Sequence, residues 1–183
     1  MTDHSQSRST NYVQVKNPEP VFTVPLDYSP WPFALKLMAK ADGFTEGFHF
    51  DIASAILRRD GKRKRKPPVL RRRAMNALLM AICFYYDPLS NKVQRSLREM
   101  AFECGLARHA LTGEVSIERA VRALESLEKD FGFVYCSSAG YATAEIFFTP
   151  KLFEFLNVFP QSLSEAKLKC LAAKSSGRES ADE

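Results

Sequence analysis

One stretch of the sequence, residues 90–148, constrains the fold more than any other, because helix and turn signals follow one another there in a fixed order. Ser96 and Glu99 have the spacing of a capping box, in which the two side chains bond backbone N–H groups that a helix start leaves free. A short helix therefore begins after Ser96, and Gly105 is placed to end it in a left-handed conformation. We expect the inward side of this helix to be Leu97, Met100, Ala101 and Cys104.

The second helix of this stretch is predicted from Ile117 to about Lys129, with Ser116 as its N-cap. At about 100° per residue, apolar and polar side chains separate onto opposite sides of that helix. A helix that packs on one side and is cationic on the other has the form of a recognition helix in a DNA groove. The apolar side consists of Ile117, Ala120, Val121, Leu124 and Leu127. The opposite side, and the candidate DNA-reading set, consists of Arg119, Arg122, Ser126 and Lys129.

The cationic side of this helix also has a plainer interpretation. Arg119 and Arg122 stand within three or four residues of acids on the same helix, and such pairs can form on a solvated face. The acids within reach are Glu118, Glu125 and Glu128. Spacing alone leaves both interpretations open.

A β-hairpin is expected after these helices, with strands over residues 132–136 and 141–148. Turn-forming residues between them and an aromatic, β-branched composition favour this pairing. A short helix, a loop, a second helix and a hairpin, in this order, predict a winged helix. We therefore expect an α+β, mostly helical fold, in which a winged helix follows an N-terminal extension with extended and helical parts.

The rest of the chain predicts additions to this domain. Five prolines between residues 12 and 32 favour an extended segment laid over the domain, because proline removes a backbone donor and extends its predecessor. We expect Phe22, Trp31 and Phe33 to anchor that segment. The expected divisions are a flexible arm (1–11), an N-terminal extension with a basic loop (12–66), the winged-helix domain (67–158), a C-terminal helix (159–174) and a disordered tail (175–183).

Three further segments carry helical or ambiguous patterns. A helix is predicted from Pro32 to about Lys40, whereas residues 48–58 are apolar and fit either a strand or a short helix. The strongest helix starts after a proline pair and runs over residues 69–86, with a continuous apolar face that includes Leu70.

Positive charge is concentrated in one run of the chain. Residues 58–73 contain ten Lys or Arg and one acid, whereas the whole chain has a net charge of +5, so the remainder is net negative. A focused positive field attracts a polyanion, although a solvated loop could carry the same charge. We expect DNA phosphates to be held by Lys62, Arg63, Lys64, Arg65, Lys66, Arg71, Arg72 and Arg73.

The sequence lacks the residues that several kinds of functional site require. The four cysteines stand at least 21 residues apart, so they predict reduced thiols and neither a metal site nor a bound cofactor. No phosphate-binding glycine–lysine loop occurs, and His4, His49 and His109 are isolated, so we expect no enzyme. No apolar run has the length of a membrane span or a signal peptide, which predicts a cytoplasmic protein without a membrane partner.

Several segments in one order resemble the IncFII-type RepA family of plasmid replication initiators. They are residues 12–23, 67–74, 83–94, 103–107, 116–124 and 148–153. The resemblance covers about residues 11–157 and corresponds to the N-terminal, winged-helix part of such proteins. It implies a sequence-specific binder of double-stranded plasmid origin DNA, which marks or opens the origin for the host initiator and helicase-loading machinery. Because family members are longer, we expect either a truncated or shortened relative or a protein whose second half lies elsewhere.

Two other functions would use the same fold. A winged-helix transcription regulator would make the same kind of DNA contacts, so the residues alone do not separate it from an initiator. A protein-interaction domain, or a homodimer, would instead expose apolar side chains. The candidates for that surface are Phe147, Phe153, Phe155 and Phe159.

Overall fold

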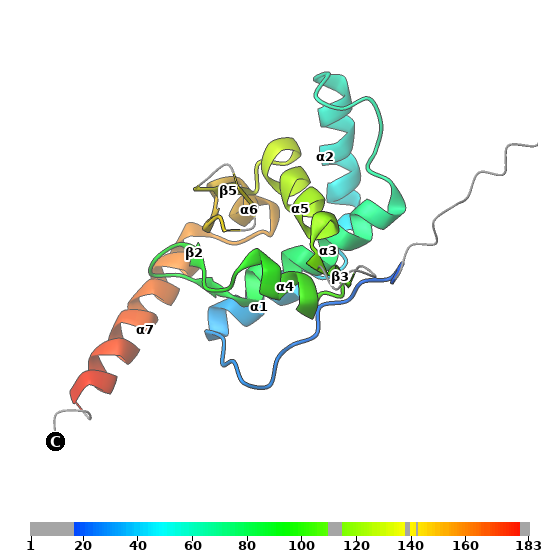
Figure 1. The fold of residues 1–183 in the computed structure, drawn as a ribbon. Helices are drawn as coiled ribbons and strands as arrows, with labels where there is room; N and C mark the ends of the chain where they lie inside the picture. The colour runs from blue at the N-terminus through cyan, green and yellow to red at the C-terminus, as the bar shows by residue number, and fades with distance from the viewer. Residues whose placement is uncertain (1–16, 110–114, 138–139, 142, 180–183) are drawn as a thin grey trace, which may run out of the picture.

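The computed structural model describes residues 17–109, 115–137, 140–141 and 143–179, and its fold is α+β and mostly helical, as the sequence predicts (Figure 1). The expected arm over residues 1–11 lies outside the described residues. The helices are α1 (Pro32–Ala41), η1 (Phe44–Glu46), α2 (Phe48–Arg59), α3 (Val69–Phe84), α4 (Leu97–Glu103), α5 (Glu118–Glu125), the π-helix η2 (Ser126–Asp130), α6 (Pro150–Phe155) and α7 (Pro160–Glu179). The strands are β1 (Tyr86–Asp87), β2 (Lys92–Val93), β3 (Arg108–His109), β4 (Val115–Ser116), β5 (Val134–Cys136) and β6 (Ile146–Phe148).

Helix α3 lies at the centre of the molecule and packs against both α1 and α5. It begins directly after the proline pair, as predicted, and it ends at Phe84, two residues before the predicted end near Tyr86. The ring of Tyr86 stacks on Phe148 with centroids 4.2 Å apart, and this contact holds Tyr86 in β1. Leu70, which was predicted on the buried face, is 38% exposed, and Val69 beside it in the first turn of α3 is 49% exposed.

A four-stranded antiparallel sheet has the order β1-β2-β6-β5. The predicted hairpin is confirmed as the β5–β6 pair, with shorter strands than expected. Val134, Ile146 and Phe148 are buried and turn one face of the hairpin toward the core. Tyr135 and Phe147 pair across the strands on the other face, with their rings stacked 4.8 Å apart.

Helix α4 begins as the sequence predicts, whereas α5 does not. The Ser96–Glu99 capping box is complete, and Gly105 has a left-handed φ of 63°. The backbone of Ser116 belongs to β4, which pairs with β3, and Ile117 takes the N-cap position, although the Ser116 hydroxyl still accepts the Glu118 N–H at 3.4 Å. The short β3–β4 pair between the two helices was not predicted.

The N-terminal segment crosses the domain in an extended form before α1 begins (Figure 1). Phe22 is buried against Phe84, with ring centroids 5.3 Å apart, and the Thr23 N–H donates to the Glu103 carbonyl at 2.9 Å. Phe33 is half-buried, with its ring centroid 6.3 Å from that of Tyr86, and Trp31 is half-buried, so Phe22 and Phe33 anchor the segment as predicted.

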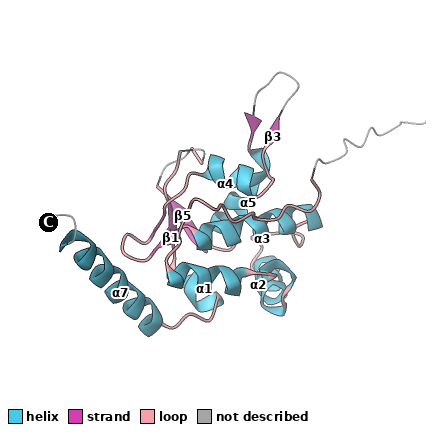
Figure 2. Ribbon diagram, turned by 90° about the horizontal axis from the view of Figure 1, so that it is seen from below, coloured by secondary structure: helices cyan, strands magenta, loops and turns pink. Residues whose placement is uncertain are grey.

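The segments on either side of the predicted winged-helix domain (67–158) contain helices, α2 before it and α7 after it. The ambiguous residues 48–58 form α2, whose Phe50 stacks on Phe131 at 5.1 Å. Helix α7 runs past residue 174, so the prediction of a disordered tail from residue 175 is wrong up to Glu179. Once a helix of this length exists, adding residues costs little, so weak helix formers can extend it. Figures 1 and 2 show α7 at the edge of the molecule, projecting from it. No helix in the described ranges is long and apolar enough to cross a membrane.

Candidate nucleic-acid interface

Helix α5 packs on α3 through the apolar side that the sequence predicts. Ala120, Leu124 and Leu127 have no exposed surface, and Ile117 and Val121 are partly buried against the same core. Burial of one side leaves the opposite side of α5 at the surface, and Figure 1 shows this helix between α2 and β5. The cationic residues of that opposite side differ in their exposure and in their bonding partners.

Arg122 and Lys129 lie at the surface of α5 and η2. Their side chains are 56% and 62% exposed, and each forms an ion pair one helical turn away, with Glu118 and Glu125. The plainer interpretation of these charges is therefore partly correct, although Glu128 instead accepts from the Cys136 N–H and the Tyr141 hydroxyl. Exposed pairs of this kind contribute little to stability and exchange readily with solvent or an anion.

Ser126 is buried, so the prediction that it faces a groove is wrong. Its hydroxyl accepts a hydrogen bond from Arg71 Nη1 at 3.1 Å. The α-helix changes to a π-helix at Ser126, and the wider π turn rotates later residues away from positions drawn at 3.6 residues per turn. The helical wheel therefore fails at Ser126, whereas Leu127 is buried and Lys129 is exposed as the wheel predicts.

Arg71 joins the basic run to α5. Besides Ser126, its Nη1 donates to the Arg122 carbonyl at 3.3 Å. Arg63, in the loop after α2, reaches the same region, where its Nη1 lies 3.2 Å from Asp130 Oδ2 at the end of η2. Burial lowers the pKa of Arg71, and the neighbouring charges of Arg63 and Arg122 lower it further. We call Arg63, Arg71 and Arg122 the arginine cluster.

Three other members of the basic run are held by the protein itself. Lys66 forms an ion pair with Asp51 of α2, and Arg72 Nη1 donates to the Thr45 carbonyl at 3.4 Å. Arg73 Nη1 lies 3.2 Å from Glu19 Oε1. These three cations already have partners within the protein, and their predicted contacts with DNA phosphates stay a prediction.

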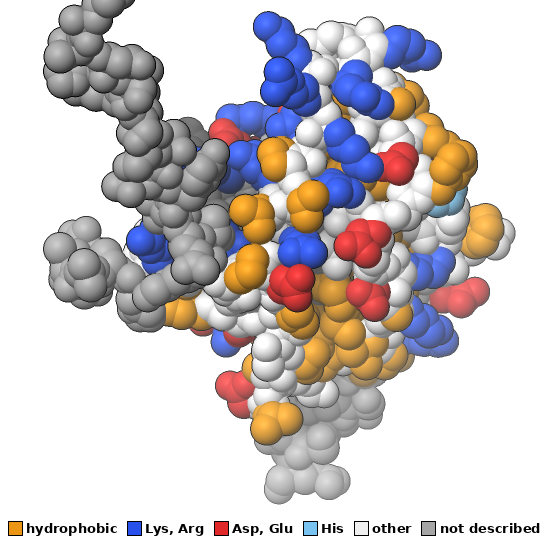
Figure 3. Space-filling model, turned by 90° about the vertical axis from the view of Figure 1, so that its right-hand side faces the viewer, with side chains coloured by type: hydrophobic (Ala, Val, Ile, Leu, Met, Phe, Trp, Pro, Cys, Tyr) orange, Lys and Arg blue, Asp and Glu red, His pale blue; other side chains and the backbone are white. Residues whose placement is uncertain are grey.

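The remaining three cations, Lys62, Lys64 and Arg65, are exposed in the loop between α2 and α3. Within the described residues, their side chains have no hydrogen bond or ion pair. Figure 3 shows Lys and Arg side chains gathered at one end of this face of the molecule. We call Lys62, Lys64 and Arg65 the open basic loop.

The N-terminal segment reaches α5, which sequence reasoning missed. Arg119 is half-buried, its Nη1 donates to the Asn17 carbonyl at 3.0 Å, and burial lowers the pKa of its guanidinium. The Asn17 amide donates in turn to the Gly105 carbonyl at 3.0 Å, and a Cβ at position 105 would collide with it. Asn17 has a left-handed φ of 55°, and the Asn17-Pro18 pair was the available signal for a turn.

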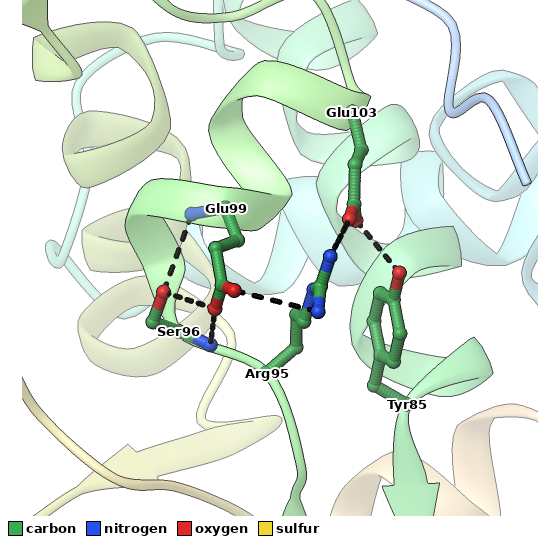
Figure 4. Close-up of polar contacts among 5 residues, drawn as sticks. All are labelled: Tyr85, Arg95, Ser96, Glu99 and Glu103. Atoms are coloured by element: carbon green, nitrogen blue, oxygen red, sulfur yellow. Dashed lines mark hydrogen bonds and ion pairs between the residues drawn. The ribbon is translucent and has the colours of Figure 1, made fainter. Parts of the chain in front are cut away.

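A polar network fixes the start of α4 against the end of α3 (Figure 4). Arg95 Nη2 and Nε lie 2.8 Å and 3.1 Å from Glu103 Oε1, and Arg95 Nη1 lies 3.4 Å from Glu99. The Tyr85 hydroxyl donates to Glu103 Oε2 at 2.9 Å, and the Arg95 guanidinium lies 5.4 Å from the centre of the Tyr85 ring. Burial and the bond to Glu103 raise the pKa of Tyr85, so it remains a donor. We call Tyr85, Arg95, Glu99 and Glu103 the Arg95 network.

The cysteines have structural surroundings. Cys83, Cys104 and Cys170 are buried and Cys136 is half-buried, and all four are free thiols. Burial raises the pKa of each, which keeps the thiols protonated. Among the described residues, no group of three His, Cys, Asp or Glu side chains could hold a metal ion.

The fold and this surface define a mostly helical α+β protein in which cations from three segments meet beside one amphipathic helix. A model of the IncFII RepA protein family matches residues 10–183. The chain is 46% identical over 173 residues to a replication initiation protein of Escherichia coli, covering 91% of this chain and 59% of that protein. The chain therefore belongs to the IncFII RepA family.

More distant relatives carry related names. A probable replication-associated protein repA1 of Buchnera aphidicola from Acyrthosiphon pisum is 28% identical over 165 residues, covering 84% of this chain and 58% of the relative. A repA2 protein of the Buchnera from Schizaphis graminum is 30% identical over 98 residues, covering 50% and 39%. The chain thus spans about three-fifths of the length of the E. coli relative. No solved structure matches the chain.

Proposed function

We propose that this chain is the origin-binding part of a plasmid replication initiator. In this proposal it binds double-stranded origin DNA in the cytoplasm, catalyses no reaction, and marks or opens the origin for the host initiator and helicase-loading machinery. Family membership and the names of the relatives, which refer to replication, support the replication role. The arrangement of the cations supports DNA as the ligand.

The order of elements favours a winged helix as the DNA-binding unit. Helix α3 is followed by β2, then α4 and α5, and then the β5–β6 hairpin, while β6 lies between β2 and β5 in the sheet. In a winged helix the second helix of the helix-turn-helix enters the major groove. This position corresponds to α5, and the hairpin corresponds to the wing.

The arginine cluster is the observation that carries the proposal. It combines one exposed arginine on α5, Arg122, with two arginines that other segments bring beside it. Arginine forms bidentate bonds to guanine edges and to phosphates, so Arg122 is the proposed base-reading residue. Lys129 and, once released from Asn17, Arg119 would extend the contact along the same side. The buried Ser126 is not part of it.

A binding experiment with the 183-residue chain tests this function. Affinity for the origin of its own plasmid is compared with affinity for scrambled DNA of the same length over a range of salt concentrations. Replacing Arg122 with Ala should cost about 1–3 kcal/mol on origin DNA and little on scrambled DNA. Lys167→Ala, which removes an exposed charge on α7, is the matched control.

Two results would contradict the proposal. Equal affinity of the unaltered chain for both DNAs would remove sequence-specific binding. Equal losses on both DNAs for Arg122→Ala would move Arg122 from base reading to phosphate contact.

A further inference from the structure

A groove of about 410 Å³ lies between α1 and α7, on elements that do not contribute to the arginine cluster. Figure 2 shows the two helices beside one another at the edge of the molecule. The apolar residues that line the groove include Trp31, Phe33, Leu37, Val158, Phe159 and Cys170.

The groove stays open because α7 turns small side chains toward the body. Ala166 and Cys170 are its buried residues in this part, and neither is large enough to fill the space beside α1. Phe159, at the start of α7, remains 71% exposed although it lines the groove. An exposed aromatic side chain at the edge of an apolar groove is typical of a surface that receives an apolar partner.

The rim of the groove is positively charged. Lys36, Lys40 and Lys169 line it, and Glu165 is the one acid among its lining residues in the described chain. Lys40 Nζ donates to the carbonyls of Leu156 and Asn157 at 3.1 Å and 2.6 Å, which engages two of its three donors, and no described acid forms an ion pair with it. Lys36 and Lys169 form no ion pair with any described residue. A partner with acidic side chains would therefore complement this rim.

Charge and shape decide between the possible occupants. DNA would leave the apolar floor unburied, and a flat bilayer does not fill a concave groove. A second copy of α7 would bring Lys167, Lys169 and Lys174 against the lysines of the rim, which disfavours self-association. An amphipathic helix with one apolar side and acidic flanks satisfies both the floor and the rim.

We propose that the groove between α1 and α7 binds an acidic amphipathic helix of a partner protein. The apolar side of that helix lies on Trp31, Val158 and Phe159, which keep exposed surface in the groove, and its acids face Lys36, Lys40 and Lys169. This site is separate from the DNA surface and does not depend on it.

Tryptophan fluorescence tests the proposal directly, because Trp31 is the one tryptophan of the whole chain and it lines the groove. The probe is a synthetic helical peptide of about 18 residues, with leucines three and four residues apart and glutamates elsewhere. We expect a saturable change in Trp31 emission. A matched peptide with lysines in place of the glutamates should bind at least about tenfold more weakly.

Variants of the chain then locate the binding. Lys36→Glu together with Lys169→Glu should reverse the preference between the two peptides, whereas Lys167→Glu, outside the groove lining, should not. Phe159→Ser should weaken the glutamate peptide about tenfold and, because Phe159 is exposed, should leave the fold intact. Arg122→Ala should bind the peptide as the unaltered chain does, which separates this test from that of DNA binding.

Three outcomes would overturn the proposal. One is the absence of any emission change with the glutamate peptide. Another is equal affinity for both peptides, which would remove the role of the lysine rim. The third is a concentration-dependent dimer in sedimentation equilibrium that Phe159→Ser abolishes, which would make a second copy of the chain the occupant.

Discussion

Arg95 and the three cations of the open basic loop carry the same charge in opposite surroundings. Arg95 contacts two carboxylates and the ring of Tyr85, and the backbone N–H of Ser96 beside it is also bonded, to Glu99 (Figure 4). Lys62, Lys64 and Arg65 have no such partner within the described residues. The arginine cluster is intermediate, since Arg63 and Arg71 are held while Arg122 is exposed.

This difference separates charges that position the fold from charges that can meet an external anion. Breaking an internal network leaves a partly buried carboxylate without its partner, which costs stability. Removing an exposed, unpaired cation costs the fold almost nothing and weakens attraction to a polyanion. Variants of the two regions should therefore affect different measurements.

The largest effect is expected from the open basic loop. Replacing Lys62, Lys64 and Arg65 with Ala should weaken binding to all DNA sequences alike and reduce the slope of log affinity against log salt by about 3, roughly one for each phosphate contact. The midpoint of urea unfolding should stay the same. An unchanged slope would show that these cations do not contact phosphates.

Arg95→Ala should show the opposite behaviour. It leaves Glu103, whose side chain is 14% exposed, without its cation, so the free energy of unfolding should fall by about 1–3 kcal/mol in urea denaturation. The salt dependence of DNA binding should not change. As a control, Arg95→Met and Glu103→Leu are made singly and together. The double variant should lose less stability than the sum of the two single losses, and a loss equal to that sum would contradict the network.

Ser96→Ala should have a smaller effect of the same kind. It removes the hydroxyl that accepts the Glu99 N–H at 3.3 Å, and loss of an N-cap side chain costs about 1 kcal/mol. Thermal and urea unfolding measure it. Ser29→Ala, at an exposed serine outside the helices, is the control and should leave both transitions unchanged.

The smallest expected effect is on how the free energy of unfolding depends on pH. The hydrogen bond from Ser96 holds the pKa of Glu99 below its ordinary value of 4.5, with a further contribution from Arg95. A depressed pKa in the folded state means that this stabilisation is present above pH 4.5 and is lost as the pH falls through the folded value. Glu99→Gln should therefore lose less stability than the unaltered chain between pH 5 and pH 3, and parallel pH profiles would contradict this.

Local signals in the sequence predicted the local structure well. The capping box at Ser96, the left-handed Gly105 and the hairpin are confirmed, because each depends on residues a few positions apart. The apolar side of α5 is confirmed for the same reason: periodicity alone determines which side can be buried.

Predictions failed where distant segments meet. Ser126 is buried because α3 covers it and the helix widens to a π turn there, and neither event has a signal in the residues near Ser126. Glu19 and Asp130 hold two arginines of the basic run, and both acids lie far from that run in the sequence.

By itself, the sequence determined the mostly helical α+β fold, the amphipathic character of α5 and the concentration of positive charge over residues 58–73. These properties depend on residue type and spacing, which do not require knowledge of the tertiary structure. Only the tertiary structure decided which cations are paired, which arginines gather beside Arg122, and that a groove opens between α1 and α7. The physical reason is that ion pairing and burial act over a few ångströms in space, between residues that can be many positions apart in the chain.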